Sequence, residues 1–537
     1  MRELQLSISS GSYLENDLCQ VAREARSEAS WSNTRISLDG ERWNLFPESA
    51  EETYISPSNN DCGLVRSPFI LEDLKDVVVD GGGGLLMVRG TPLAGNGRVG
   101  VIDSPVVPFV IRNCQNVTIR NLSIDWQTPA TVQGLCVASG RGYFDVALET
   151  DQRVWCWNDM MYLEGEGWTW PVTRLLAVDA ETGATLSGTG DNIGLGYEQV
   201  WRYEMVEEGI VRVKGPDLPV DVQGAKILFW CSFPDTGARR APAIFIERSS
   251  NVRVEDVTLH YCRAMGVIAQ TSSDLFFERL NVLPSGNRKF SLAADGTHFV
   301  NCRGKLEFTD CVMQNQLDDA INSHGLYYQI VRKLDARTLR VRTAHPQHVG
   351  VEGFVVGDLV RLCKMPYMEE IGKLRLSRIR TLNSETQDFC FDEDLPEGLG
   401  EGDMVEDLDA SPEIDIRNCT FRWNRARGIL INGSKPIRVR DCEFESAGSA
   451  IMIESSPLWA EAGPVSDVRI ENNSFRNTAN CPMWGAAVIE AKPTFREGAP
   501  EGLKPFHGKL CVKDNRFENC MGSELSASSF ESIESDV

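Results

Sequence analysis

Short stretches in which apolar and polar residues alternate recur along most of the chain, and they are rich in Val, Ile and Phe. This period of two predicts β-strands with one buried face, and the Asn, Asp, Gly and Ser residues between them predict turns. The helical period of 3.6 residues is nearly absent. The pattern therefore predicts an all-β protein. The strand-rich segments are 104–126, 241–270, 271–300, 301–325, 410–433, 434–455 and 465–491.

These segments recur with a spacing of roughly 20–30 residues, which is typical of solenoid proteins. One unit cannot bury its apolar face alone, so successive units are expected to stack, with each strand pairing in parallel with the same strand one coil later. The predicted fold class is a right-handed parallel β-helix. Cysteines recur at similar places in several units, which indicates small buried thiols, with a disulfide framework as the alternative. They are Cys114, Cys302, Cys311, Cys419, Cys442 and Cys520.

Two long segments interrupt the repeat, and both are typical of antiparallel strands with Gly and Asp turns. Each is long enough to form a small β-barrel or sandwich inserted between coils. The expected organisation is an N-terminal segment with the first coils (1–129), a first insertion (130–240), central coils (241–325), a second insertion (326–410), C-terminal coils (411–525) and an acidic tail (526–537).

The chain is acidic, with 537 residues, a net charge of -23 and a pI of about 4.8. This balance argues against nucleic-acid binding, which needs clustered Lys and Arg, and it fits a neutral ligand. No stretch is apolar over the length of a transmembrane helix, so membrane insertion is not expected. The N-terminus has no signal-peptide pattern, so the chain as it stands is expected in the cytoplasm, or outside it if a leader has been removed (secreted or periplasmic).

Three aspartates are expected to gather on one face of the coils. Superposing the repeats on the small residue before one strand places Asp295 one coil before Asp319, whose neighbour is Asp318. Coils stack about 4.8 Å apart, so the three carboxylates should lie within about 10 Å of one another. Like charges at this distance raise the pKa of at least one carboxyl, which then keeps a proton near neutral pH.

A protonated carboxyl beside an ionised one is the pair that glycoside hydrolysis requires, because one donates to the glycosidic oxygen and the other activates water or attacks the sugar. Placement on adjacent coils favours the wider separation, about 6.5–9.5 Å, that leaves room for water and gives inversion. A solvated Asp-Asp turn and a calcium site are the alternatives. The third aspartate in register favours catalysis.

Two motifs carry a resemblance to known enzymes: AADGTHF (293–299) and NQLDDAINSHG (315–325). On a parallel β-helix they are similar to the three-aspartate site of polygalacturonases, glycoside hydrolase family 28, although the Gly-His-Gly and Arg-x-Lys motifs of that family are not evident. With the two insertions, residues 60–525 more closely resemble glycoside hydrolase family 110, the α-1,3-galactosidases. The resemblance implies inverting hydrolysis without a metal or cofactor. It also implies that Asp318 is the general acid and that Asp295 and Asp319 hold and deprotonate the water.

The resemblance further implies that the partner is an oligosaccharide or glycoconjugate ending in α-1,3-linked galactose, either blood-group-B-like or linear. A homodimer is left open. The alternatives are a polygalacturonase-like hydrolase of another α-glycan, a calcium-dependent lyase, and a carbohydrate-binding β-helix without activity. Side chains expected from their ladder positions to bind the sugar are Arg263, His298, Asn322, His324, Trp423, Arg427, Asn432, Glu454 and Trp484.

Overall fold

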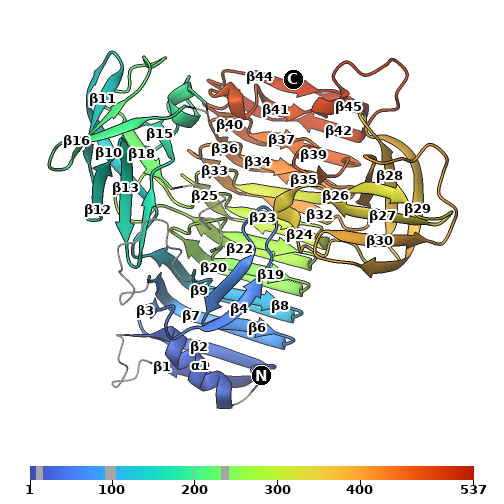
Figure 1. Ribbon diagram of the computed structural model, residues 1–537, viewed down its shortest axis with the longest axis horizontal. Helices are drawn as coiled ribbons and strands as arrows, with labels where there is room; N and C mark the ends of the chain where they lie inside the picture. Colours follow the sequence, from blue (N-terminus) through green and yellow to red (C-terminus); the bar gives the residue numbers. More distant parts are fainter. Residues whose placement is uncertain (8–15, 29, 91–104, 197–198, 232–240) are drawn as a thin grey trace.

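Stacked coils form the centre of the molecule, and two antiparallel β-insertions project from its sides (Figure 1). The computed structural model describes residues 1–7, 16–28, 30–90, 105–196, 199–231 and 241–537. The coils run from the N-terminal end to the C-terminal end of the chain, and strands of successive coils pair in parallel. The predicted parallel β-helix with two inserted β-domains is confirmed.

One parallel ladder runs along the coils and leads directly into the second insertion. Its strands are β6 (Phe69–Glu72), β8 (Phe109–Arg112), β19 (Ile244–Glu247), β21 (Val267–Gln270), β23 (Thr297–Val300), β26 (Ile321–Lys333), β34 (Ile429–Ile431), β37 (Ile451–Ile453), β41 (Ala487–Ala491) and β44 (Ser523–Ala527).

The remaining coil strands belong to a large second sheet. In this sheet some coils contribute one long strand, and others contribute two short consecutive strands. They are β1 (Arg2–Ser7), β2 (Thr34–Asp39), β3 (Arg42–Leu45), β7 (Lys75–Val88), β9 (Gln115–Trp126), β20 (Ser250–Leu259), β22 (Ser273–Val282), β24 (Arg303–Thr309), β25 (Val312–Gln314), β32 (Glu413–Arg417), β33 (Thr420–Arg422), β35 (Ile437–Arg440), β36 (Glu443–Glu445), β39 (Asp467–Glu471), β40 (Ser474–Arg476), β42 (His507–Lys513), β43 (Arg516–Glu518) and β45 (Phe530–Ser535).

The alternating pattern of the sequence explains how the coils stack. Alternate residues of each strand point inward, and equivalent apolar residues lie on top of one another along the ladder. One such column is formed by Val252, Leu275, Leu306, Ile414 and Ile437, all nearly inaccessible to solvent. The 16 cysteines all lie in the described part of the chain, and each is a free thiol. Most are buried, as expected for small side chains of the core.

The first insertion has an antiparallel sheet and a small three-stranded sheet around its own apolar core. Its elements are β10 (Thr131–Gly140), β11 (Tyr143–Leu148), β12 (Arg153–Trp157), β13 (Met160–Gly165), β14 (Trp168–Pro171), β15 (Arg174–Val178), η1 (Asp191–Gly194), β16 (Arg202–Glu207), β17 (Ile210–Lys214) and β18 (Lys226–Trp230).

The second insertion shares the strand β26 with the coils. Ile321–Ser323 of this strand pair in parallel with β23 and β34, whereas residues 327–333 pair antiparallel with β31 and β27. The other elements are β27 (Thr338–Thr343), η3 (Pro346–His348), β28 (Leu359–Lys364), β29 (Glu369–Thr381), β30 (Thr386–Phe391) and β31 (Met404–Asp407).

Two features differ from the sequence prediction. The helix α1 (Leu18–Glu28) lies against β1 and β3 near the N-terminal end, where no helix was expected. The acidic segment 526–537 is not a tail, because β45 pairs in parallel with β42 and completes the stack.

Within the described residues, no helix is long and apolar enough to cross a membrane.

Candidate active site

The structure brings together the three aspartates on the turns that precede β23 and β26. One carboxylate oxygen from each of Asp295, Asp318 and Asp319 lies within 4.8 Å of the others. The backbone explains this register, because the N–H of Gly296 donates to the carbonyl oxygen of Asp319 at 2.8 Å and so fixes the two turns one above the other. These nearest oxygens lie closer together than the separation of 6.5–9.5 Å expected from the sequence.

Asp319 is the most deeply buried of the three and is held by Arg427. The guanidinium of Arg427 donates to both carboxylate oxygens, at 2.9 and 2.8 Å, and its backbone N–H donates to Oδ1 at 2.9 Å. Burial raises the pKa of Asp319 to about 7; the carboxylates of Asp318 and Asp295 add to this increase, and Arg427 opposes it. The cluster therefore exchanges a proton near neutral pH.

Asp295 belongs to a hydrogen-bonded row that ends at a backbone carbonyl. Burial and the nearby His298 lower the pKa of His324 to about 3, so His324 is neutral at neutral pH. Its Nδ1–H donates to the carbonyl oxygen of Gly325 at 2.7 Å, which leaves Nε2 as an acceptor. The Nε2–H of His298 therefore donates to this nitrogen at 3.0 Å. Nδ1 of His298 lies 2.8 Å from Oδ2 of Asp295, so this pair shares one proton.

Asp318 lies near a second arginine, Arg425. Nη1 of Arg425 is 3.6 Å from Oδ2 of Asp318 and donates to the carbonyl oxygen of Leu317 at 2.7 Å. The first insertion supplies the partner for the remaining nitrogens: Nε and Nη2 donate to the carboxylate of Asp191 at 2.5 and 2.7 Å. The guanidinium also stacks on the ring of Trp484 at 4.3 Å. The positive charge of Arg425 is therefore balanced by Asp191 and held beside Asp318.

A cavity of about 910 Å³ opens onto the three carboxylates. Asp318 is the most accessible of them, with 18% of its side chain exposed, against 5% for Asp295 and 1% for Asp319. Both insertions contribute to the walls, so the cavity is not an open groove along the coils. The contributed side chains are Arg174 and Trp230 from the first insertion and Gln347 and Met365 from the second.

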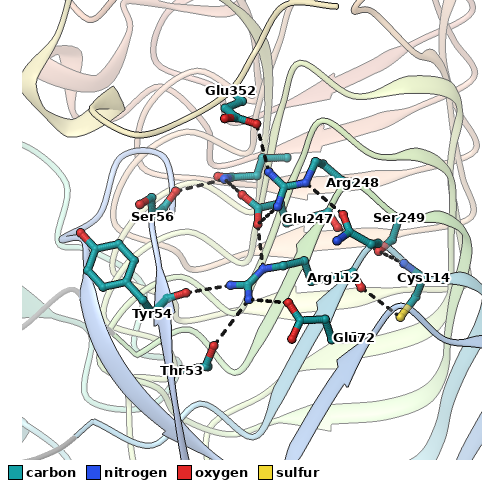
Figure 2. Close-up of polar contacts among 12 residues, drawn as sticks. Thr53, Tyr54, Ser56, Glu72, Arg112, Cys114, Glu247, Arg248, Ser249 and Glu352 are labelled. Carbon is teal, nitrogen blue, oxygen red and sulfur yellow. Dashed lines mark hydrogen bonds and ion pairs between the residues drawn. The ribbon is translucent and has the colours of Figure 1, made fainter. Parts of the chain in front are cut away.

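A hairpin near the N-terminus supplies a further wall. Figure 2 shows how Arg112 fixes this hairpin, formed by β4 (Glu51–Ile55) and β5 (Gly63–Ser67), onto the coils. Arg112 donates to the carbonyl oxygen of Tyr54 at 2.7 Å and to Glu247 at 3.0 Å. The loop beyond β4 then presents Asn59, whose amide donates to Glu461 at 3.1 Å. Asn59 and Glu461 both line the cavity.

Five of the nine side chains expected to bind a sugar line the cavity: His298, Asn322, Arg427, Glu454 and Trp484. Burial raises the pKa of Glu454, and of Glu461 beside it in the cavity wall. Carboxyl groups of this kind can hydrogen-bond to sugar hydroxyls as donors or acceptors.

Arg263 and His324 do not line the cavity. The guanidinium of Arg263 is nearly buried against the rings of Trp168 and Trp170, at 5.1 and 4.8 Å, so it joins the first insertion to the coils. Nε2 of His324 lies 3.0 Å from His298 and 3.7 Å from Glu461, so His324 supports two residues of the cavity wall without lining the cavity itself.

Trp423 and Asn432 also lie outside the cavity wall. Trp423 adopts a positive φ of 60° at a turn, and its ring packs on the guanidinium of Arg422 at 4.3 Å, outside the cavity. The amide of Asn432 donates to the backbone carbonyl oxygen of Glu454 and so connects neighbouring coils. Ladder position alone therefore does not determine which side chains reach the cavity.

Several cavity residues were not predicted from the sequence. Arg425 stands two residues before Arg427 on the same turn, and this spacing could have revealed it. The others lie in the insertions, in the hairpin loop or in the segments that connect the C-terminal coils, none of which carries a repeat pattern, so no sequence signal pointed to them. They are Asn59, Arg174, Trp230, Gln347, Met365, Trp459, Glu461 and Phe495.

Comparison with known proteins shows matches on both parts of the fold. Residues 338–405 match the family described as GLAA-B beta-barrel domain II, and residues 406–531 match a right-handed beta helix region, which confirms the predicted handedness. The chain is 30% identical over 528 residues to α-1,3-galactosidase B of Phocaeicola vulgatus, covering 93% of this chain and 82% of the relative.

Two further relatives show similar coverage. Over 490 residues the chain is 28% identical to α-1,3-galactosidase B of Bacteroides thetaiotaomicron, covering 89% of this chain and 75% of that protein. Over 493 residues it is 27% identical to α-1,3-galactosidase A of Bacteroides fragilis, covering 90% and 77%. These alignments extend over the coils and both insertions.

Proposed function

The chain belongs to the α-1,3-galactosidase family, glycoside hydrolase family 110, and from this premise we propose that it releases terminal α-1,3-linked galactose with inversion. Family membership identifies it as a glycoside hydrolase of the galactosidase type. The observation that carries the proposal is the cavity over three carboxylates whose nearest oxygens lie within 4.8 Å of one another.

Asp318 is the proposed general acid. It is the most accessible of the three carboxyl groups, and so it can reach the oxygen that joins galactose to the next residue. In the reaction its proton passes to the glycosidic oxygen while the bond from C1 to that oxygen breaks. The leaving sugar then departs as a neutral alcohol.

Asp295 and Asp319 are proposed to hold the attacking water. Each has a fixed partner, His298 for Asp295 and Arg427 for Asp319, that orients its carboxylate. The water oxygen bonds to C1 on the face opposite the leaving group, and its proton passes to this carboxylate pair. The short separation of the carboxylates does not by itself favour inversion, so the inverting outcome is proposed from family membership.

The walls of the cavity support action at a chain end. Side chains from both insertions and from the β4–β5 hairpin form parts of its wall, which favours a chain end over an internal segment of a long glycan. Polar groups such as Asn322, Glu454 and Glu461 are available for the hydroxyls of one terminal sugar.

Two measurements test the proposal. Galactose release is measured from α-galactosides with 1→3, 1→4 and 1→6 linkages, with and without a fucose branch; preference for 1→3 is expected. The fucose pair separates blood-group-B-like from linear substrates. Proton NMR of early product should then show β-galactose first. Initial α-galactose would overturn inversion and indicate a retaining route.

A further inference from the structure

The cavity wall contains buried polar side chains and a group of more exposed apolar ones. His298 and Asn322 are two of the buried polar residues. Toward the solvent, apolar side chains from three separate elements form one wall. They are Met365 after β28, Pro457, Leu458 and Trp459 in the turn between β37 and β38 (Glu461–Ala462), and Phe495 in η5 (Thr494–Arg496).

Two of these side chains are unusually exposed for their chemistry. Leu458 is 81% exposed and Trp459 51% exposed. Exposed apolar area of this size lowers stability relative to burial, and next to a polar site it commonly marks a binding surface. Single exposed apolar residues are common on proteins, but these two are consecutive and belong to the wall of the catalytic cavity.

The turn that carries Trp459 is held in place by its neighbours. Ser456 and Glu461 form an antiparallel bridge, with N–H to carbonyl bonds of 2.9 and 3.0 Å. The N–H of Trp459 also donates to Oγ of Ser456 at 3.3 Å. On the other side, the indole packs against His345 of the second insertion, with ring centroids 5.2 Å apart. The ring is therefore presented in a fixed position.

We propose that Trp459, supported by Leu458, binds the sugar that carries the terminal galactose, with the C–H face of a neutral pyranose ring packed on the indole. The inference rests on the proposed function, because it assigns the second sugar of the same substrate. Aromatic rings suit this role, since they offer a large flat apolar surface with little conformational freedom to lose. Glu454 and Glu461 line the same cavity, so a ring with carboxylate or sulfate groups is disfavoured.

The test compares two substrates that share galactose and differ in the leaving group. Galactosyl-α-1,3-galactose has a second ring, whereas α-galactosyl fluoride has only a fluorine atom. Trp459→Ala should lower kcat/KM for the disaccharide about tenfold, in the range of measured aromatic contacts. Hydrolysis of the fluoride should stay within about twofold of the wild-type value, which also shows that the variant is folded. Trp459→Phe should recover most of the loss.

Trp157→Ala is the matched control, since Trp157 is 65% exposed and is not among the side chains that line the cavity. It should leave both substrates unchanged. An equal loss on both substrates, or no loss on the disaccharide, overturns the inference while the proposed function stands. Wild-type protein that releases no galactose from either substrate overturns the proposed function and this inference with it.

Discussion

Asp191 and Arg425, 234 residues apart in the sequence, form a bidentate ion pair that joins the first insertion to the catalytic turn. Both side chains are nearly inaccessible to solvent. Asn192 and Ile193, which follow Asp191, have positive φ angles of 49° and 56°, and this conformation is costly for a β-branched residue. The strained turn therefore delivers Asp191 to Arg425, and the pair balances a positive charge that lies 3.6 Å from Asp318.

Asp191→Asn should destabilise the protein strongly. The change removes the carboxylate that accepts from two nitrogens of the buried Arg425 and leaves the more distant Asp318, at 3.6 Å, beside its charge. Loss of one partner from a buried pair typically costs about 3–5 kcal/mol of unfolding free energy. Chemical denaturation measures the effect. Asp256→Asn is the control, because it breaks the exposed pair with Arg279 and should cost no more than about 1 kcal/mol. Equal losses in the two variants would contradict a special role for the buried pair.

Asp318→Asn should abolish release of galactose from ordinary α-galactosides. General acids typically contribute about 10²–10⁴-fold to the rate, and an amide cannot donate the required proton. Activity on α-galactosyl fluoride should survive, because fluoride leaves without protonation. The two rates are measured on the same folded sample. Near-normal release from the disaccharide would remove Asp318 from the acid role.

The pH dependence should reflect Asp319. If its carboxylate takes the water proton, kcat/KM must rise with pH as Asp319 ionises, with an acidic limb near its pKa of about 7. Arg427 lowers this pKa, so Arg427→Gln should move the limb to higher pH. Profiles of kcat/KM against pH measure the shift. A limb that stays in place in the variant would point to another group.

Burial of Asp319 should also make stability depend on pH. Its folded pKa is raised above the ordinary value of 3.8, so the folded state binds more protons than the unfolded state between about pH 4 and 7. The free energy of unfolding contributed by this group therefore falls as pH rises through that range. Denaturation of wild type and Asp319→Asn at several pH values tests this sign, and an equal slope in both would refute it.

His298 should act by positioning Asp295. His298→Asn keeps an N–H donor near the place of Nδ1, whereas His298→Leu removes it. Because a hydrogen bond to a charged group is worth about 1.5–3 kcal/mol, the Leu variant should lose roughly tenfold or more in kcat relative to the Asn variant. His260→Leu, at a half-buried histidine bonded to the carbonyl oxygen of Leu283, controls for the loss of a histidine elsewhere. Equal kcat in the two His298 variants would exclude the role.

A chelator should leave activity unchanged. The three carboxylates are close enough to hold a cation, but Arg427 and Arg425 already place two positive charges beside them. These charges repel a metal ion and perform its neutralising role. Activity is compared before and after EDTA, and strong inhibition that calcium reverses would restore the calcium alternative.

The coil register could be predicted from the sequence because it follows from local rules. Apolar alternation and a small residue before each strand place Asp295 above Asp319. An added Cβ at Gly296 would lie 2.5 Å from the carbonyl oxygen of Ala320, so the small residue is required by close approach. Such constraints recur in each coil and can be aligned by eye.

Long-range contacts could not be predicted in this way. Asn59 and Trp459 reach the cavity from a hairpin loop and an irregular turn, and Asp191 reaches Arg425 from an insertion. None of these segments repeats. Trp423 shows the opposite failure. Its position in the repeat predicted a ring in the cavity, but its turn directs the ring outside. The short helix α1 was missed because 11 residues give little periodic signal.

The strand β26 has a consequence for protein engineering. It begins next to Asp319 and ends inside the second insertion without a break. A chimera that exchanges the second insertion with that of a relative must therefore keep the length of this strand, because a one-residue slip would exchange its inward and outward faces. A slip of this kind would also displace the catalytic turn, so the second insertion cannot be treated as an interchangeable module.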